Sequence, residues 1–454
     1  MNKVQGKYRR PFILFSSFLF FISCAVNPKV YKEIDLAAGT GDFDAAVNVI
    51  VAGQESKKPI YSEKNAILLF LDKGFLEYYA KSYAKSSQSL QEAERLIEEA
   101  YTKSITAGFL SYILNDNTKD YPGEDFEDIY INIFNALNYY NRGDIDGALV
   151  EIRKLSSANG KLDLLAGKYN YKDPKTGASL EELAQKEAAG AQLPGGKKVE
   201  FNNSALARYL AALFYLADGN TENAQIEFDK LQTAFLTNKD IYSNPIPRAV
   251  ELARNVPNEK TMLNFICFSG LSPVKVEEKI TFFFPIFRNP ALYVSNVKLP
   301  KMVQRPSKID RIEAVINGKI KVNLELLENI SAVVEETFAI RYANIAAKTY
   351  IRTLIKYVAT DIAAAEVERN NGDLTAFLTA LAVKKTFEAT ESADIRMSRY
   401  LPGKAYIGGI LLDPGTYNVT VNFYSGNAII SKSEHNNFIV REKGLNLIDA
   451  VSLK

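Results

Sequence analysis

Histidine and cysteine are scarce in this chain and tryptophan is absent: its 454 residues include one His, two Cys and no Trp. With a single histidine, no serine has a plausible imidazole base for a Ser-His-Asp triad. No Cys/His cluster has metal-ligand spacing. The phosphate-binding patterns GxxxxGK[ST] and GxGxxG are also missing. We therefore expect no cofactor and no metal, and we expect a protein that is not an enzyme.

The chain also lacks an apolar run long enough to cross a membrane. The most apolar stretch, Phe12 to Ser23, has twelve residues, whereas a span takes about 20. Four cations precede it, and no acidic residue occurs before Cys24. This pattern predicts a signal peptide over residues 1–23. Two alternatives stay open: ordinary signal cleavage after residues 23–25, and an uncleaved anchor.

The residues before Cys24 resemble a bacterial lipobox, with Phe21 at the usual leucine position. The resemblance implies that Cys24 is lipidated and becomes the new N-terminus. Because Ala25 rather than Asp follows, it further implies sorting to the outer membrane. We expect the protein to lie in the cell envelope, anchored to the membrane by the lipid on Cys24, on a side that the sequence does not specify.

Neither basic nor acidic residues dominate the chain. The formal net charge is +2, but four of the 55 basic residues belong to the predicted signal peptide, so the mature chain is near −2. This balance gives no electrostatic case for nucleic acid as a partner. The second cysteine, Cys267, lies in the apolar run NFICF, which indicates a buried small hydrophobe.

The first half shows a repeated helix–turn–helix pattern. Gly41, Gly143 and Gly219 are each followed five residues later by an alanine, at positions 46, 148 and 224. In tetratricopeptide repeats such a glycine closes one helix in a left-handed turn and the alanine admits close packing of the next. A weaker copy has its turn near residue 81 and Ser86 in the alanine position. We predict a degenerate tetratricopeptide-like array over residues 24–258, with insertions near 105–125 and 157–202.

After about residue 259 the pattern changes to strands. Asn317-Gly318 between two alternating runs predicts a type I′ hairpin, and Tyr417, Val419, Val421 and Phe423 alternate on one strand face. A long helix is expected from about residue 329 to 369, closed by Gly372, followed by a second helix over 373–387. The fold class is therefore α+β and multidomain. Residues 259–454 are predicted to form an antiparallel sheet with two helices against one face.

Few residues are candidates for function. Glu124, Asp125, Glu127 and Asp128 could form a carboxylate site, but their place at a helix start favours interaction with the helix dipole. His435 is expected in a solvated turn. A basic stripe on the long helix is a candidate partner contact, and a solvated face is its alternative: Arg341, Lys348, Arg352 and Lys356. Three tyrosines on the inner face of the first helix of each pair are further candidates, and burial in the core is their alternative: Tyr78, Tyr139 and Tyr215.

The layout resembles a family of uncharacterised bacterial lipoproteins in which a tetratricopeptide-like half precedes an α+β half. The resemblance is carried by YPGEDFEDIYINIFNALNYYNRGDIDGALVEIRK, GLSPVKVEEKITFFFP and ADIRMSRYLPGKAYIGG…LDPGTYNVTV. We expect a non-enzymatic, lipid-anchored scaffold that binds an envelope protein. The alternatives are an outer-membrane lipoprotein that regulates peptidoglycan synthesis, similar to activators of penicillin-binding proteins, and an envelope hydrolase that works with carboxylates alone.

Overall fold

The computed structural model describes residues 31–106, 119–157, 160–162, 203–257, 259–284, 287 and 289–454. The predicted signal peptide and Cys24 lie outside the described residues, as do residues 107–118 and 163–202, which make up most of the two predicted insertions.

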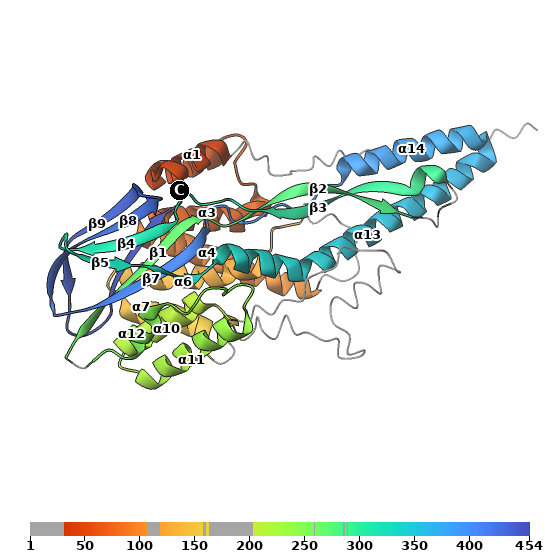
Figure 1. Cartoon of the computed structure of the whole chain (residues 1–454). Helices are drawn as coiled ribbons and strands as arrows, with labels where there is room; N and C mark the ends of the chain where they lie inside the picture. Colours follow the sequence, from red (N-terminus) through yellow and green to blue (C-terminus); the bar gives the residue numbers. More distant parts are fainter. Residues whose placement is uncertain are drawn as a thin grey trace, which may run out of the picture.

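Among the described residues of the first half, four helix pairs and one short helix make up the array (Figure 1). The bounds are α1 (Lys32–Thr40), α2 (Phe43–Gln54), α3 (Ala66–Tyr79), α4 (Tyr83–Thr106), α6 (Asp125–Asn141), α7 (Ile145–Ser156), α10 (Ala205–Ala217), α11 (Thr221–Thr237) and α12 (Arg248–Arg254). Each pair packs on itself, and successive pairs contact one another through α2 and α3, α4 and α6, and α7 and α10. The predicted tetratricopeptide-like array is confirmed.

The predicted turns between paired helices are also confirmed. Gly41, Gly143 and Gly219 have φ of +91°, +78° and +76°, a region where only glycine is free of steric cost. The following residue of each turn, Asp or Asn, caps the second helix by accepting a hydrogen bond from a backbone N–H. The alanines five residues after each glycine are fully buried.

The second pair makes the same turn with other residues. Lys81 adopts the left-handed conformation, at φ +59°, without being a glycine. Ser86 occupies the alanine position, fully buried, and its hydroxyl donates to the carbonyl of Gly74 at 2.8 Å. A Cβ on Gly74 would lie 2.7 Å from the Leu90 side chain, so the glycine permits the close approach of α3 and α4.

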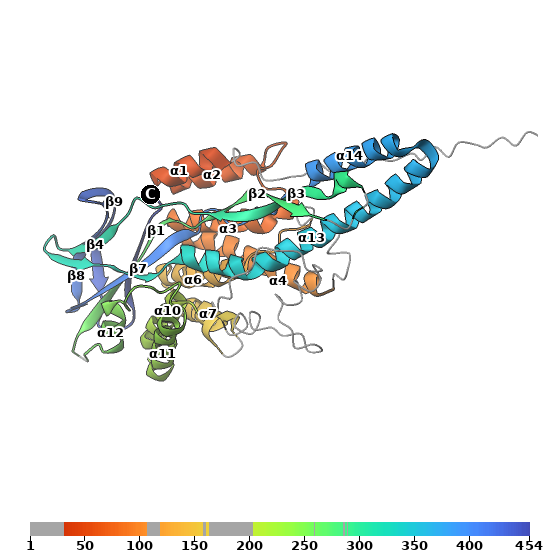
Figure 2. The same ribbon diagram turned by 45° about the vertical axis from the view of Figure 1, so that its right-hand side comes forward.

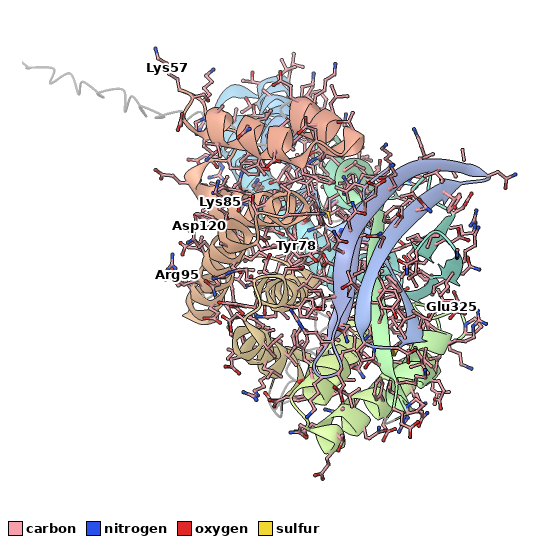
Figure 3. The ribbon with its side chains drawn as sticks, turned by 90° about the vertical axis from the view of Figure 1, so that its left-hand side faces the viewer. Lys57, Tyr78, Lys85, Arg95, Asp120 and Glu325 are labelled. Atoms are coloured by element: carbon pink, nitrogen blue, oxygen red, sulfur yellow. The ribbon has the colours of Figure 1, made fainter. Side chains whose placement is uncertain are left out.

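A four-stranded sheet in the order β10-β1-β7-β6 lies against the helices (Figures 1 and 3). Its strands are β1 (Thr261–Leu271), β6 (Glu325–Glu328), β7 (Pro402–Leu412) and β10 (Asn446–Ser452). β1 is buried on both faces along nearly its whole length. Ile266 and Phe268 face the helical core, and Phe268 lies 4.9 Å from Phe134 of α6 between ring centroids.

A second sheet, in the order β5-β4-β8-β9, covers the other face of the first one. Its strands are β4 (Arg311–Ile316), β5 (Ile320–Asn323), β8 (Gly415–Ser425) and β9 (Ala428–Val440). The predicted Asn317-Gly318 hairpin joins β4 to β5, with both residues at positive φ. Cys267 and Phe265 of β1 pack in this second core, so the predicted burial of Cys267 is confirmed. Burial also raises the pKa of its thiol.

An arm projects from the body in Figures 1 and 2. It consists of α13 (Ile330–Asn371), α14 (Asp373–Thr390) and the two-stranded ribbon of β2 (Val274–Phe283) and β3 (Val294–Val303). At 42 residues, α13 is about 63 Å long at 1.5 Å per residue. Aromatic side chains form a separate small core where the ribbon meets the helices; its buried aromatic members are Phe282, Phe284, Phe287, Tyr350 and Tyr357.

The predicted α+β class is confirmed, with two differences in the second half. β10 pairs parallel to β1, so the first sheet is mixed. The start of α13 packs on β7 of the first sheet, but the rest of α13 and α14 pack on each other and on the β2–β3 ribbon. The face of the sheet that both helices were expected to cover is occupied mostly by the helical array. The apolar residues on both faces of β1 are what this arrangement requires.

Candidate functional site

A groove of about 370 Å³ opens where the first two repeat turns meet the last two strands. Its lining comes from four segments, at residues 38–43, 78–83, 431–434 and 449–454. Tyr78 lies on this boundary between helices and strands in Figure 3. Its hydroxyl donates to the carboxylate of Asp449 at 2.5 Å, and burial next to this carboxylate raises the pKa of Tyr78.

β10 is an edge strand of the first sheet, and one of its sides borders the groove. The Leu447 N–H donates to the hydroxyl of Tyr140 at 2.8 Å, so this N–H points away from β1. Backbone groups alternate along a strand. Asp449 and Val451 therefore also point their N–H and C=O groups away from β1, at the stretch of β10 that lines the groove.

β9 is the edge strand of the second sheet, and it forms the opposite wall. Lys432 and Glu434 form an ion pair of 2.5 Å on the rim. His435 is a correction to the sequence interpretation: it lies within β9, half-buried opposite Val419, and not in a turn. The middle of this strand is an unbroken polar run, residues 431–437, in which half-buried and exposed positions alternate from 431 to 436. Burial, with Lys81 nearby, lowers the pKa of His435.

The four carboxylates at the start of α6 are each bound by other groups of the chain, and two of them share Arg341. Glu127 completes a capping box, because its side chain accepts a hydrogen bond from the Glu124 N–H at 2.8 Å. Glu124 pairs with Lys275 and Arg341, Asp125 pairs with Arg341, and Asp128 pairs with Lys161. The helix-start interpretation is thus borne out.

The basic stripe on α13 joins segments of the molecule. Arg341 contacts Glu124 and Asp125 at 3.1 and 2.6 Å. Arg352 is 4% exposed and contacts Glu391, as does Lys356. Lys348 is half-buried. The solvated-face alternative does not describe these residues, since three of the four bind carboxylates of the same chain.

The inner faces of α3, α6 and α10, each the first helix of its pair, do not form an open surface. Tyr78 and Tyr215 are 2% and 7% exposed, and Tyr139 is half-buried, with its hydroxyl accepting from Gln91. β1, β7 and β10 cover the face to which Tyr78 belongs. The core alternative holds for Tyr78 and Tyr215, because the sheet of the same chain fills the concave side of the array.

Residues 394–400, between α14 and β7, belong to a motif that carries the family resemblance, but the sequence gives no sign that they join the helices to the sheet. The carboxylate of Asp72 on α3 accepts from the Ser398 hydroxyl at 2.9 Å and from the Arg399 N–H at 2.7 Å. The Ser398 N–H donates to Glu127 at 2.6 Å. Arg399 also forms an ion pair of 2.7 Å with Asp35 of α1. This segment, which we call the clasp, binds three of the helices to the sheet.

Burial of these carboxylates makes stability depend on pH. Desolvation raises the pKa of Asp72 to about 6 and that of Glu127 to about 7, with Glu124 adding to the latter; burial also raises the pKa of Asp128. These three carboxyl groups together therefore bind more protons in the folded chain than in the unfolded chain between about pH 4 and pH 7. Their contribution is complete below the unfolded pKa, about 4, and is lost as the pH rises through the folded values.

We therefore expect the protein to be more stable at pH 5.5 than at pH 8, by about 1–3 kcal/mol. The lowered pKa of His435 acts in the opposite direction, as a single group against three. Urea unfolding at the two pH values measures the difference. Equal stability, or lower stability at pH 5.5, would show that the buried carboxylates are not shifted as described.

The comparisons with known proteins identify no relative: no family model matches the chain, and no curated protein or solved structure matches it significantly. Within the part of the chain that the structure describes, no helix combines the length and apolar character that crossing a membrane requires. In the same residues, no group of three or more His, Cys, Asp or Glu side chains is arranged to hold a metal ion.

Proposed function

We propose that this protein is a lipid-anchored scaffold of the bacterial cell envelope that holds a partner protein and performs no reaction. The groove between β9 and β10 is the observation that supports this function. Two sheet edges and two repeat turns meet there, and an edge strand offers main-chain groups to an extended segment of another protein. The partner's backbone would add to β10 beside Asp449 and Val451.

The anchor in this proposal comes from the sequence around Cys24. Two or three acyl chains on a cysteine hold a protein stably at a membrane, whereas a single chain is marginal. We expect Cys24→Ala to move the protein from the membrane fraction to the soluble fraction, and the wild-type N-terminal peptide to carry the mass of a lipid on Cys24. An unmodified N-terminus beyond residue 24 would instead indicate a soluble exported protein.

The groove is tested by a change in one backbone N–H. In Val451→Pro the ring removes an N–H that points away from β1, so the bonds between β10 and β1 are kept. We expect random peptides displayed on phage to be enriched on the mature chain and to lose at least tenfold in binding to the proline variant. Val451→Thr, which keeps the N–H and the shape of the side chain, is the matched control.

Two results would contradict the groove as a peptide site. One is the absence of enriched peptides on the wild-type chain, and the other is equal binding to the wild type and to Val451→Pro. Thermal unfolding of the proline variant checks that the strand is intact. A loss of binding is attributed to the missing N–H only if the melting temperature of Val451→Pro stays within a few degrees of the wild type.

A further inference from the structure

The wall of the groove on the helix side contains a row of aromatic rings. Phe43, Tyr79, Tyr78 and Tyr83 follow one another in this row, with 5.3, 5.9 and 5.7 Å between successive ring centroids. The two inner rings are buried, and the two outer ones, Phe43 and Tyr83, are half-buried. An apolar side chain that enters the groove on this side would therefore cover ring surface that the chain leaves partly open to solvent.

The opposite wall carries small polar side chains. Ser431 and Ser433 of β9 lie opposite Phe423 and Val421 of β8, and these two apolar residues belong to the core between the sheets. Residues that lie opposite one another on paired strands point to the same face of the sheet. The two serines therefore face the first sheet, half-buried, on the β9 side of the groove.

The free edge of β10 would hold an added strand between these two walls. Leu447 and Val451 pack on the helical side of the first sheet, whereas Ile448 and Ala450 pack on the second sheet. A segment that pairs with this edge continues the first sheet, so its side chains alternate between the same two sides. A helix could not pair in this way, because its main-chain groups are bonded to one another.

The spacing along a strand matches the aromatic row. Side chains on one face of a strand recur about every 6.6 Å, so a row of four rings can receive about two of them. The side chains between these would face the serines of β9. The two walls thus favour a segment in which apolar residues alternate with short polar ones.

Charge adds a further preference. Among the other charged groups of the lining, Lys432 pairs with Glu434, the Lys454 ammonium donates to a backbone carbonyl, and the Asp449 carboxylate accepts hydrogen bonds from two side chains of the chain. Lys81 is exposed at the turn between α3 and α4, and its ammonium forms no ion pair with any residue that the structure describes. An acidic side chain of the segment would complement this charge.

We propose that the groove binds an extended segment in which apolar residues alternate with short polar ones and an acidic residue lies beside Lys81. The apolar residues cover the aromatic row, and the short polar ones face Ser431 and Ser433. This inference rests on the proposed function, because it names the class of segment that the groove would hold. Main-chain pairing with β10 supplies affinity, and the two walls supply specificity.

The sequences of enriched phage peptides test the alternation. On the mature chain carrying Cys24→Ser, we expect peptides with apolar residues at every second position and Ser, Thr, Ala or Gly between them. The pool selected on the same chain with Val451→Pro should lack this pattern. Peptides that depend on the Val451 N–H but show no alternation would overturn this inference and leave the groove as a peptide site. The absence of any enriched peptide would remove the proposed function as well.

A charge reversal tests the acidic position. In Lys81→Glu we expect the acidic residue of the enriched peptides to be replaced by lysine or arginine, a gain that a misfolded variant could not produce. Lys85→Glu is the matched control, because this exposed lysine in the first turn of α4 lies outside the groove lining (Figure 3). It should leave the acidic preference unchanged. The same preference in Lys81→Glu as in the wild type would overturn the placement beside Lys81.

The aromatic wall is tested with the best enriched peptide. Phe43→Ser together with Tyr83→Ser should raise its dissociation constant at least tenfold. Leucine at both positions keeps an apolar surface and should bind nearly as well as the wild type, which separates loss of the wall from loss of the fold. Phe283→Ser, at a 63% exposed position on β2 outside the groove lining, should have no effect. Wild-type affinity in the double serine variant would overturn the role of the rings.

Discussion

Replacing Glu328 by alanine is expected to lower the free energy of unfolding by about 3–5 kcal/mol. The carboxylate ends β6 and is completely buried. It accepts hydrogen bonds from Tyr130 of α6 at 2.6 Å, from Tyr242 after α11 at 2.8 Å and from the Ser204 hydroxyl. Alanine would leave the buried hydroxyls of Tyr130 and Ser204 without this acceptor, while the Tyr242 hydroxyl would keep only its longer bond to the Asn203 carbonyl, at 3.1 Å.

The first turn of α10 adds to the expected loss. The Leu206 N–H donates to Glu328 at 3.2 Å, so the negative charge also compensates the positive end of that helix. Glu325→Ala on the same strand is the matched control, because this side chain is about one-third exposed and pairs only with Arg248 on the surface. Figure 3 shows Glu325 at the edge of the molecule. We expect the control to change stability by less than about 1 kcal/mol.

The measurement is urea unfolding of the two variants beside the wild type. A loss below about 1 kcal/mol for Glu328→Ala would mean that β6 is not held to the helices through this carboxylate. Glu328→Gln keeps the volume and loses the charge. It should fall between alanine and the wild type, because one amide oxygen replaces two carboxylate oxygens.

Asp72→Ala is expected to have the next largest effect, a loss of about 2–4 kcal/mol. It would leave three buried donors unpaired: the Ser398 hydroxyl, the Arg399 N–H and the Tyr61 hydroxyl, which lies 2.8 Å from the carboxylate. Two of these donors belong to the clasp, so the loss should appear as loosening of the contact between α3 and residues 398–399. Hydrogen exchange of the backbone amides in the clasp measures this directly.

An exposed acid on another first-half helix, Asp146, supplies the control, since Asp146→Ala removes no buried contact. Asp72→Asn separates charge from shape, because it removes the titrating group. It should reduce the gain in stability between pH 8 and pH 5.5. An unchanged pH dependence in Asp72→Asn would assign that gain to Glu127 and Asp128 instead. Wild-type rates of amide hydrogen exchange in the clasp of Asp72→Ala would contradict its role in joining the halves.

Local signals in the sequence were sufficient for the turns of the array and for the hairpins. A glycine at positive φ followed by Asp or Asn acts within a few residues, so Gly143-Asp144 specifies its turn regardless of the rest of the fold. The same holds for Asn317-Gly318. The Lys81 turn is predicted only by its position relative to the other repeats, because lysine has no preference for the left-handed conformation.

The contacts that join the two halves could not be predicted, because their partners lie far apart in the sequence. Nothing near Ser398 or Arg399 indicates that Asp72, 326 residues away, accepts their hydrogen bonds. The basic residues of α13 are equally uninformative, since their acids lie near residue 124 and at Glu391. The sequence suggests a turn at His435, because an exposed edge strand such as β9 has the polar composition of a loop.

The pattern of β1 was visible but not fully interpreted. Its run of apolar residues indicates a strand buried on both faces, and this is what closes the concave side of the array. Apolar residues on both faces of β1 require a cover on each face, and the helical array supplies one of them. The groove could not be found in this way, because it depends on which strands become the edges.

Photo-crosslinking in intact cells tests most directly whether the groove holds a partner. A benzophenone amino acid replaces Lys432 in the groove wall or, as control, Ile439, which is 59% exposed on the same strand and outside the groove lining. We predict one defined protein adduct from position 432, its loss in the Val451→Pro background, and no such adduct from position 439. No adduct at position 432, or the same adduct from both positions regardless of Val451→Pro, would contradict the scaffold function proposed for this groove.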